Sequence, residues 1–342
     1  MVAGSCCCHL SFPVCFVSGN LQIYNLIFQS MNQKPVLNYP LQFAFLLGLM
    51  GVFMVFTALL VPLIGSRLMH VDFRLALREM NKPEYANISR LLNTMASLLV
   101  FFLPSLALGR LLNKHPFTEL GFNTRLNSKQ LLLILGLTVS GILLSGALGE
   151  LNEWLPLPEK WYVKARQMEN EYRDSMMGMA TMKSAVDYFL SLLVMAAAPA
   201  FFEEVLFRGS FQQVFIGWTK SKWMGLLITS ILFSVIHFSW FGFLPRLALG
   251  MILGTVFLYS RNIWLNIFLH FMYNGLIVTQ LYLSGREGKP VSKTMDENLP
   301  VWWGIFALLI VLILLRAFKR ESEALLNRKK ESIHSSPENI VS

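Results

Sequence analysis

AVDYFLSLLVMAAAPAFFEEVLFR, residues 185–208, is the stretch that decides the fold. An α-helix rises 1.5 Å per residue, so about 20 apolar residues cross a hydrocarbon core about 30 Å thick. Lipid offers the backbone no hydrogen-bond partners, which is why a spanning segment must be helical. The stretch therefore predicts a transmembrane helix over about 185–207 that carries Glu203 and Glu204 and leads into Arg208.

Apolar stretches of similar length occur along the whole chain. Of the 342 residues, 54% are hydrophobic and 14% are charged, whereas soluble domains carry about 25% charged residues. We therefore predict an all-α fold, a polytopic membrane helical bundle of about eight transmembrane helices. The predicted spans are 41–65, 91–112, 130–149, 185–207, 223–241, 243–260, 262–283 and 299–317.

The segments between the spans suggest a division of the chain. Residues 1–30 precede Met31-Asn32-Gln33-Lys34, which resembles a natural start, so we interpret them as a leader or an upstream extension. The connection 150–184 mixes charged and aromatic residues and predicts an amphipathic helix at the membrane interface. The predicted parts are the leader 1–30, transmembrane helices and interfacial loop 31–184, a core 185–284, a loop and last helix 285–317, and a polar tail 318–342.

Basic residues indicate the orientation, because they are in excess on the cytoplasmic side of membrane proteins. The tail is rich in Lys and Arg, so we expect the C-terminus in the cytoplasm and the acidic loop 150–184 outside. One loop does not fit this orientation. Residues 66–90 are placed outside in this topology, and yet they carry five basic side chains. These are Arg67, Arg74, Arg78, Lys82 and Arg90.

The net charge of +9 does not indicate a nucleic-acid partner, because the basic residues lie in short loops and in the tail. We expect membrane lipid as a partner instead, and no nucleic acid. All four cysteines fall within the first fifteen residues, so the rest of the chain has neither a disulfide framework nor a thiolate metal site.

Ionisable side chains inside spans cost about 2.5 kcal/mol or more at the membrane centre, so they are candidates for function. Glu204 and Arg208 are four residues apart, share one helix face and can pair. Glu203 points about 100° away from that face. His237 and His270 are the other ionisable groups within spans, and Arg246, beside Pro245 at a helix edge, is expected to reach toward the interface.

Glu203, His237 and His270 are predicted to lie at similar depth, roughly 14–23 Å from the cytoplasmic ends of their helices at 1.5 Å per residue. A carboxylate and two imidazoles at one depth could activate a water and stabilise an oxyanion. The same three side chains could also bind zinc. A single buried histidine or Glu–Arg pair is often only structural, but three polar sites at one depth favour chemistry.

Three motifs resemble those of the CPBP family, which comprises the CAAX prenyl endopeptidases of the Rce1 type and the bacterial Abi proteins. APAFFEEVLFRG, residues 198–209, resembles the EExxxR motif followed by Gly. FSVIH at 233–237 matches FxxxH, and HFMYN at 270–274 matches HxxxN/D. The motifs occur in order within about residues 185–284, the predicted core.

This resemblance implies intramembrane proteolysis of membrane-associated proteins or peptides, and we expect a bacterial inner (plasma) membrane. Glu203 and His237 would activate the attacking water, and His270 and Asn274 would stabilise the oxyanion. The remaining motif residues would support the site; they are Glu204, Arg208 and Phe233. Family members are described both as metal-dependent, with zinc then on Glu203, His237 and His270, and as metal-free, and this stays open.

Other protease classes lack their motifs, because no histidine is followed by glutamate as in HExxH and no GxGD sequence occurs. Two other functions remain open. A non-catalytic membrane scaffold or immunity protein could retain the fold, and a transporter could use buried Glu and His as a proton relay. The absence of an evident inverted repeat argues against the transporter.

Overall fold

The computed structural model describes residues 37–123, 126–288 and 299–334, with side chains up to residue 327 in the last range. The chain divides into two units, 1–38 and 39–342, and almost all of the first lies outside the described residues. The predicted leader and the four cysteines are therefore not described. Everything below concerns residues 39–334.

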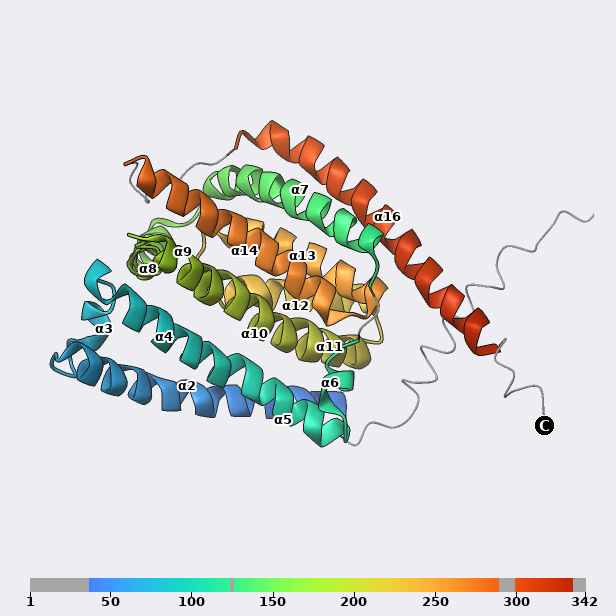
Figure 1. The fold of residues 1–342 in the computed structure, drawn as a ribbon, viewed down its shortest axis with the longest axis horizontal. Helices are drawn as coiled ribbons and strands as arrows, with labels where there is room; N and C mark the ends of the chain where they lie inside the picture. Colours follow the sequence, from blue (N-terminus) through green and yellow to red (C-terminus); the bar gives the residue numbers. More distant parts are fainter. Residues whose placement is uncertain (1–36, 124–125, 289–298, 335–342) are drawn as a thin grey trace, which may run out of the picture. The chain divides into compact units, whose positions relative to one another are not determined.

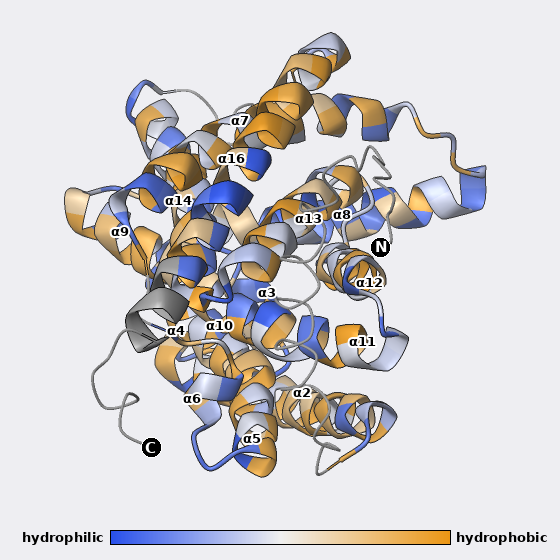
Figure 2. Ribbon diagram, turned by 90° about the vertical axis from the view of Figure 1, so that its right-hand side faces the viewer, coloured by the Kyte–Doolittle hydropathy of each residue, from blue (hydrophilic) through white to orange (hydrophobic). Residues whose placement is uncertain are grey.

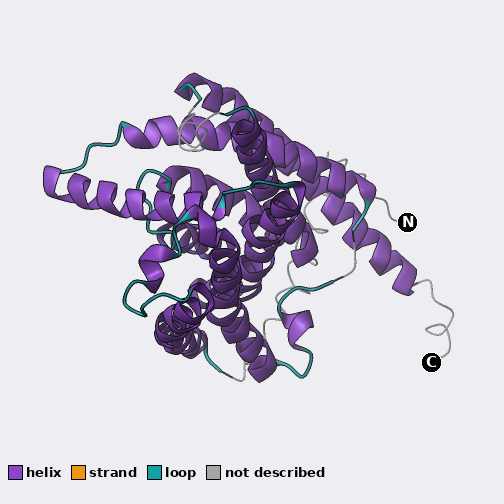
Figure 3. Ribbon diagram, turned by 60° about the vertical axis from the view of Figure 1, so that its left-hand side comes forward, coloured by secondary structure: helices purple, strands orange, loops and turns teal. Residues whose placement is uncertain are grey.

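The described residues form helices and no strand, which confirms the all-α class (Figure 1, Figure 3). In chain order the elements are α2 (Tyr39–Met69), α3 (Ala76–Glu79), η1 (Pro83–Tyr85), α4 (Ala86–Ser97), η2 (Leu98–Phe102), α5 (Leu103–Leu112), α6 (Pro116–Glu119), α7 (Ser128–Glu153), α8 (Glu159–Met179), α9 (Ala185–Ser191), η3 (Leu192–Ala197), α10 (Ala198–Leu206), η4 (Phe207–Phe211), α11 (Gln212–Thr219), α12 (Lys222–Val235), α13 (Phe243–Ser260), α14 (Ile263–Arg286) and α16 (Val301–His334).

Six helical segments of the described chain are long and apolar enough to cross a membrane. They are Tyr39–Met69, Pro83–Leu112, Ser128–Glu153, Ala185–Thr219, Phe243–Ser260 and Val301–Asn327. Their outer faces are apolar, as at Val52 and Val55, which are 64% and 66% exposed (Figure 2). Apolar residues on the outside of a helical bundle face lipid, so the chain is an integral membrane helical bundle.

The predicted count of eight spans is not confirmed. Helix α14 has 24 residues but is less apolar than the six, because Asn266, His270 and Asn274 interrupt it. Helix α12 has only 14 residues, about 21 Å at 1.5 Å per residue.

The prediction of a span over 223–241 is wrong at its end, since α12 ends at Val235 and a non-helical turn, residues 236–242, follows. Phe238 adopts a left-handed φ of 52°, which ends the helix. Polar side chains satisfy the backbone of the turn, since Asn152 donates to Trp240 O at 2.9 Å and accepts from Leu244 N at 2.9 Å. Irregular backbone at membrane depth requires this kind of internal satisfaction.

Helix α8 crosses the other helices and is seen end-on in Figure 1. It is the helix predicted within 150–184, and its place at the membrane interface stays a prediction. The 66–90 segment lies at the same end of the bundle, where η1 and α4 contact α8. Arg90 in this segment is buried and donates to Met179 O at 3.0 Å and Thr181 O at 2.6 Å. Arg90 therefore has a structural role. This accounts for one of the five basic residues of 66–90 that disagreed with the predicted topology.

The last helix extends further than expected. Helix α16 has 34 residues and ends at His334, whereas the predicted span ends at 317. Residues 318–334 contain no Gly or Pro, so the helix is not interrupted before His334. Gln130 at the start of α7 donates to Ser322 at 3.0 Å, which fixes the extension against the bundle. The first part of the predicted polar tail is thus helical.

Candidate active site

Glu204 is the most densely bonded side chain of the predicted site. Its carboxylate is fully buried on α10, and its Oε1 accepts from Arg208 Nη1 at 2.8 Å, four residues along the chain. The same oxygen lies 2.8 Å from His270 Nδ1 on α14, and Oε2 accepts from Asn266 Nδ2 at 3.3 Å. The predicted Glu204–Arg208 pair is present, and the carboxylate also fixes the ring of His270.

Arg208 links this helix to its neighbours. Its guanidinium is fully buried, and Nη2 donates to the backbone oxygen of Gly250 on α13 at 3.1 Å. It also lies over the Phe233 ring of α12, 4.8 Å from the ring centroid. A cation over an aromatic face is attracted by the ring quadrupole, which offsets the absence of a hydrogen-bond partner for Arg208 Nε.

Phe233 brings the three motifs together. Besides Arg208, its ring contacts His237 edge-on at a centroid distance of 5.2 Å and His270 at 5.8 Å. Both histidines therefore contact the same aromatic ring, although they come from different segments of the chain. Residues of all three motifs therefore contact this one ring, as expected if the predicted polar sites lie at similar depth.

His237 lies just outside α12, in the turn that follows it, and not within a span as predicted. Its ring Nδ1 is 2.7 Å from Phe233 O. A carbonyl oxygen only accepts, so Nδ1 carries the proton and the neutral ring has an unprotonated Nε2. This tautomer leaves His237 with one free lone pair that can accept a proton or orient a water.

Glu203 and Asn274 differ from the side chains above. Both are partly buried. Among the described residues, neither side chain has a hydrogen bond or ion pair, in contrast to the three contacts of Glu204. Glu203 is nevertheless close enough to His270, Arg208 and Arg246 to interact with them electrostatically. The prediction that Arg208 does not satisfy Glu203 is consistent with the structure.

Helix α8 covers the turn that carries His237. Three residues on one face of α8, spaced three apart, contact the turn and the start of α13. Glu169 accepts from Ser239 Oγ at 2.6 Å, the Arg166 guanidinium lies 4.0 Å from the ring centroid of Phe241, and Arg246 lies 4.9 Å over Tyr172. Arg246 does not simply reach for the interface as expected, because its Nη1 is buried without a hydrogen-bond partner.

The sequence interpretation missed Asn266, although its spacing was a signal. Asn266 precedes His270 by four residues and Asn274 by eight, so the three polar side chains form one stripe along α14. Asn266 is fully buried, and besides Glu204 it donates to Leu253 O on α13 at 2.6 Å. It thus joins the carboxylate of α10 to the backbone of α13.

We expect Asn266→Ala to lower the free energy of unfolding by about 1–3 kcal/mol, because it leaves buried acceptors without a donor. Asn274→Ala is the matched control on the same face of α14, and it should lower stability less because the Asn274 side chain has no hydrogen bond within the described residues. Thermal unfolding in detergent would measure both. Equal losses for the two variants would contradict this role of Asn266.

The residues proposed as zinc ligands do not form a clear metal site. Among the described residues, no group of three or more His, Cys, Asp or Glu side chains is placed to hold a metal ion. His270 Nδ1 is also already bonded to Glu204. Zinc binding by Glu203, His237 and His270 stays a prediction, and metal analysis of the purified protein would test it.

The segment that carries the motifs was compared with known protein families. A family described as "Type II CAAX prenyl endopeptidase Rce1-like" matches residues 185–276, a segment that contains all three motifs. No curated protein and no solved structure matched the chain. This match confirms the resemblance seen in the motifs: residues 185–276 are similar to the Rce1-like family of type II CAAX prenyl endopeptidases.

Proposed function

We propose that this chain is an intramembrane endopeptidase that hydrolyses peptide bonds of membrane-associated proteins or peptides. The observation that carries the proposal is the difference between two adjacent carboxylates. Glu204 binds Arg208, His270 and Asn266, whereas Glu203 has no such bond within the described residues. A carboxylate held in place by three donors serves structure, and an adjacent one that is free to exchange a proton serves chemistry.

In this mechanism Glu203 and His237 activate a water. The water donates one hydrogen bond to the Glu203 carboxylate and the other to His237 Nε2, the free lone pair of the ring. Glu203 removes a proton as the water oxygen attacks the carbonyl carbon of the substrate. The same carboxyl group then returns the proton to the leaving nitrogen, and the C–N bond breaks.

His270 and Asn274 stabilise the negative oxygen of the tetrahedral intermediate. In the proposed intermediate, His270 Nδ1 donates to the Glu204 carboxylate at 2.8 Å, and Nε2 of the same ring also carries a proton. That Nε2–H and the amide N–H of Asn274, four residues along the same face of α14, are two donors for the oxyanion. Glu204 therefore acts through His270 as a positioning residue.

New protein termini in membranes would test the proposal. Cells producing the wild-type chain are compared with cells producing Glu203→Gln or His237→Ala at equal levels, and membrane peptides with new termini are quantified by mass spectrometry. We expect a set of new termini with the wild type that both variants lack. Identical sets in all three strains would refute the protease and favour a non-catalytic membrane scaffold or immunity protein.

The same preparations can address the metal alternative. The metal content of the purified wild type, Glu203→Gln and His237→Ala distinguishes the two mechanisms. If the wild type holds a stoichiometric metal that the variants lose, the mechanism is metal-dependent and the metal-free one above is wrong.

We also propose that the chain lies in a bacterial inner membrane with its C-terminus in the cytoplasm, as the basic residues of α16 favour.

A further inference from the structure

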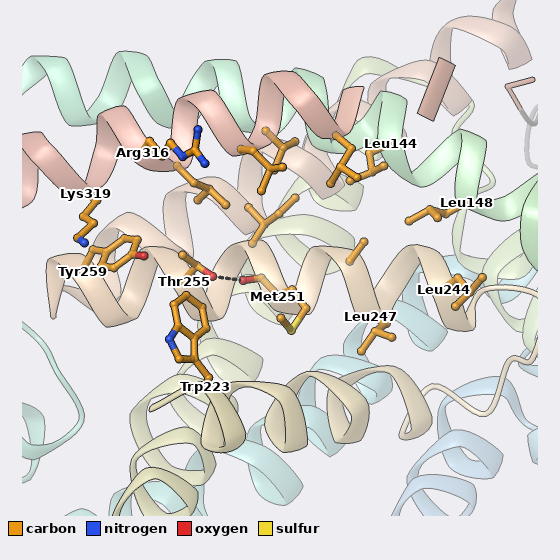
Figure 4. Close-up of a pocket in the computed structure, with 16 residues that line it drawn as sticks. Leu144, Leu148, Trp223, Leu244, Leu247, Met251, Thr255, Tyr259, Arg316 and Lys319 are labelled. Atoms are coloured by element: carbon orange, nitrogen blue, oxygen red, sulfur yellow. Dashed lines mark hydrogen bonds between the residues drawn. The ribbon is translucent and has the colours of Figure 1, made fainter. Parts of the chain in front are cut away.

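A long apolar groove lies between α7, α13 and α16, with one contribution from α12. It encloses about 570 Å³ and is lined mainly by apolar side chains (Figure 4). Among the described residues, the charged side chains on its wall are Arg316 and Lys319 of α16, and they lie at the same end as Tyr259 and Trp223. The groove is thus apolar along its length and basic at one end.

This groove is separate from the candidate active site. Its α13 residues are Leu244, Leu247, Ala248, Met251, Ile252, Thr255 and Tyr259, whose spacing of three to four places them on one face. Other parts of the α13 surface face the candidate active site. There the backbone oxygen of Gly250 accepts a hydrogen bond from Arg208, and that of Leu253 accepts one from Asn266. None of the predicted catalytic residues lines the groove, so α13 separates the two.

The dimensions of the groove suit one acyl chain. From Leu244 to Tyr259 the α13 wall rises by fifteen steps of 1.5 Å, about 22 Å. One leaflet of a bilayer contributes about half of a hydrocarbon core about 30 Å thick. The groove therefore accommodates the full depth of a lipid tail from one leaflet.

The charges at the basic end suit an anionic headgroup. Lys319 Nζ lies 5.7 Å over the Tyr259 ring and 3.8 Å from Glu323 Oε1, a loose and exposed ion pair. Arg316 has no hydrogen bond or ion pair within the described part of the chain, and it lies one helical turn before Lys319. Aromatic rings and basic side chains together at one end are typical of the headgroup level of a membrane.

We propose that this groove binds one acyl chain of an anionic phospholipid, whose phosphate contacts Arg316 and Lys319. The apolar wall recognises the chain, and the two cations select the anionic headgroup over a zwitterionic one. The bound lipid fills the space between α16 and α13 and joins the last helix to the core of the bundle.

Native mass spectrometry of the purified full-length chain tests the headgroup preference. Phosphatidylglycerol and phosphatidylcholine with the same acyl chains compete for the wild type, Arg316→Gln/Lys319→Gln and Arg320→Gln. Arg320 is the control, because it carries the same charge on the same helix but does not line the groove. We expect the wild type and the control to retain phosphatidylglycerol at least tenfold better, and the double variant to lose this preference. Equal retention of both lipids by the wild type would overturn the proposal.

A second pair of variants tests the location of the chain. Ala248→Trp fills the groove, whereas Leu132→Trp adds the same ring at a position of α7 that is 69% exposed and does not line the groove. We expect only Ala248→Trp to lose bound phosphatidylglycerol.

A lipid-modified peptide is then added as a competitor of phosphatidylglycerol. If it displaces phosphatidylglycerol from the wild type, and the peptide without its lipid does not, the occupant is a substrate tail and the phospholipid proposal is wrong.

Discussion

Glu203→Gln is expected to reduce proteolysis by about 10²–10⁴-fold, the usual contribution of a general base. Glutamine keeps the size of the side chain and its capacity to hold a water, but it cannot take a proton from it. Because Glu203 has no hydrogen bond or ion pair within the described residues, we expect its replacement to leave the melting temperature nearly unchanged. Cleavage of the substrates found by their new termini, measured beside thermal unfolding in the same detergent, gives both values.

The comparison of stability with activity makes this prediction specific. A loss of activity together with a large loss of stability would assign Glu203 to the structure of the site and not to its chemistry. Full activity of Glu203→Gln would remove the water-activating role altogether. Glu323→Gln is a control for the loss of one carboxylate, since Glu323 is half exposed and remote from the site in the sequence.

Glu204→Gln is expected to have the opposite profile, with a loss of about 3–5 kcal/mol in the free energy of unfolding. This is the usual cost of removing one partner from a buried ion pair, because the other charge stays buried without compensation. Here the uncompensated charge is Arg208, whose guanidinium is fully buried. His270 also loses the carboxylate that holds its ring. Denaturation in mixed micelles would measure the loss.

A double variant separates charge from packing. In Glu204→Gln/Arg208→Met no buried charge is left unpaired, so we expect at least half of the lost stability to return. Activity should not return with it, because His270 remains without its carboxylate. A double variant as unstable as Glu204→Gln alone would mean that the buried Arg208 charge is not the cause of the loss.

The features that the sequence predicted are those that depend on local spacing. Apolar length predicts helices such as α2 and α7, and a spacing of four residues predicts the Glu204–Arg208 pair, because both follow from the geometry of one helix. The end of α12 at Val235 was not predicted, because residues 236–242 contain neither Pro nor Lys, Arg, Asp or Glu to mark it. The turn that follows the helix depends on a left-handed residue, Phe238, and on the side chain of Asn152, which is remote in sequence.

Contacts between helices account for the rest of the difference. Asn266 binds Glu204 across two helices, and Tyr172 of α8 contacts Arg246 of α13. Spacing within a helix shows which face a residue occupies but does not show which helix lies opposite. The sequence therefore identified the motif residues on each helix, while the role of Asn266 and the position of Arg246 emerge only from the packed structure.

Helix α13 contributes to the site mainly through its backbone. The oxygens of Gly250, Leu253 and Gly254 accept side-chain hydrogen bonds from Arg208, Asn266 and Gln212, which lie on three different elements. A substitution on α13 does not remove these oxygens, because they belong to the backbone, although a side chain at Gly250 would meet Ser230 of α12 at 3.0 Å. One inserted or deleted residue before Gly250 would instead rotate the rest of the helix by about 100° and separate all three from their donors. The length of this helix is therefore far less free to change during evolution than the identity of its residues.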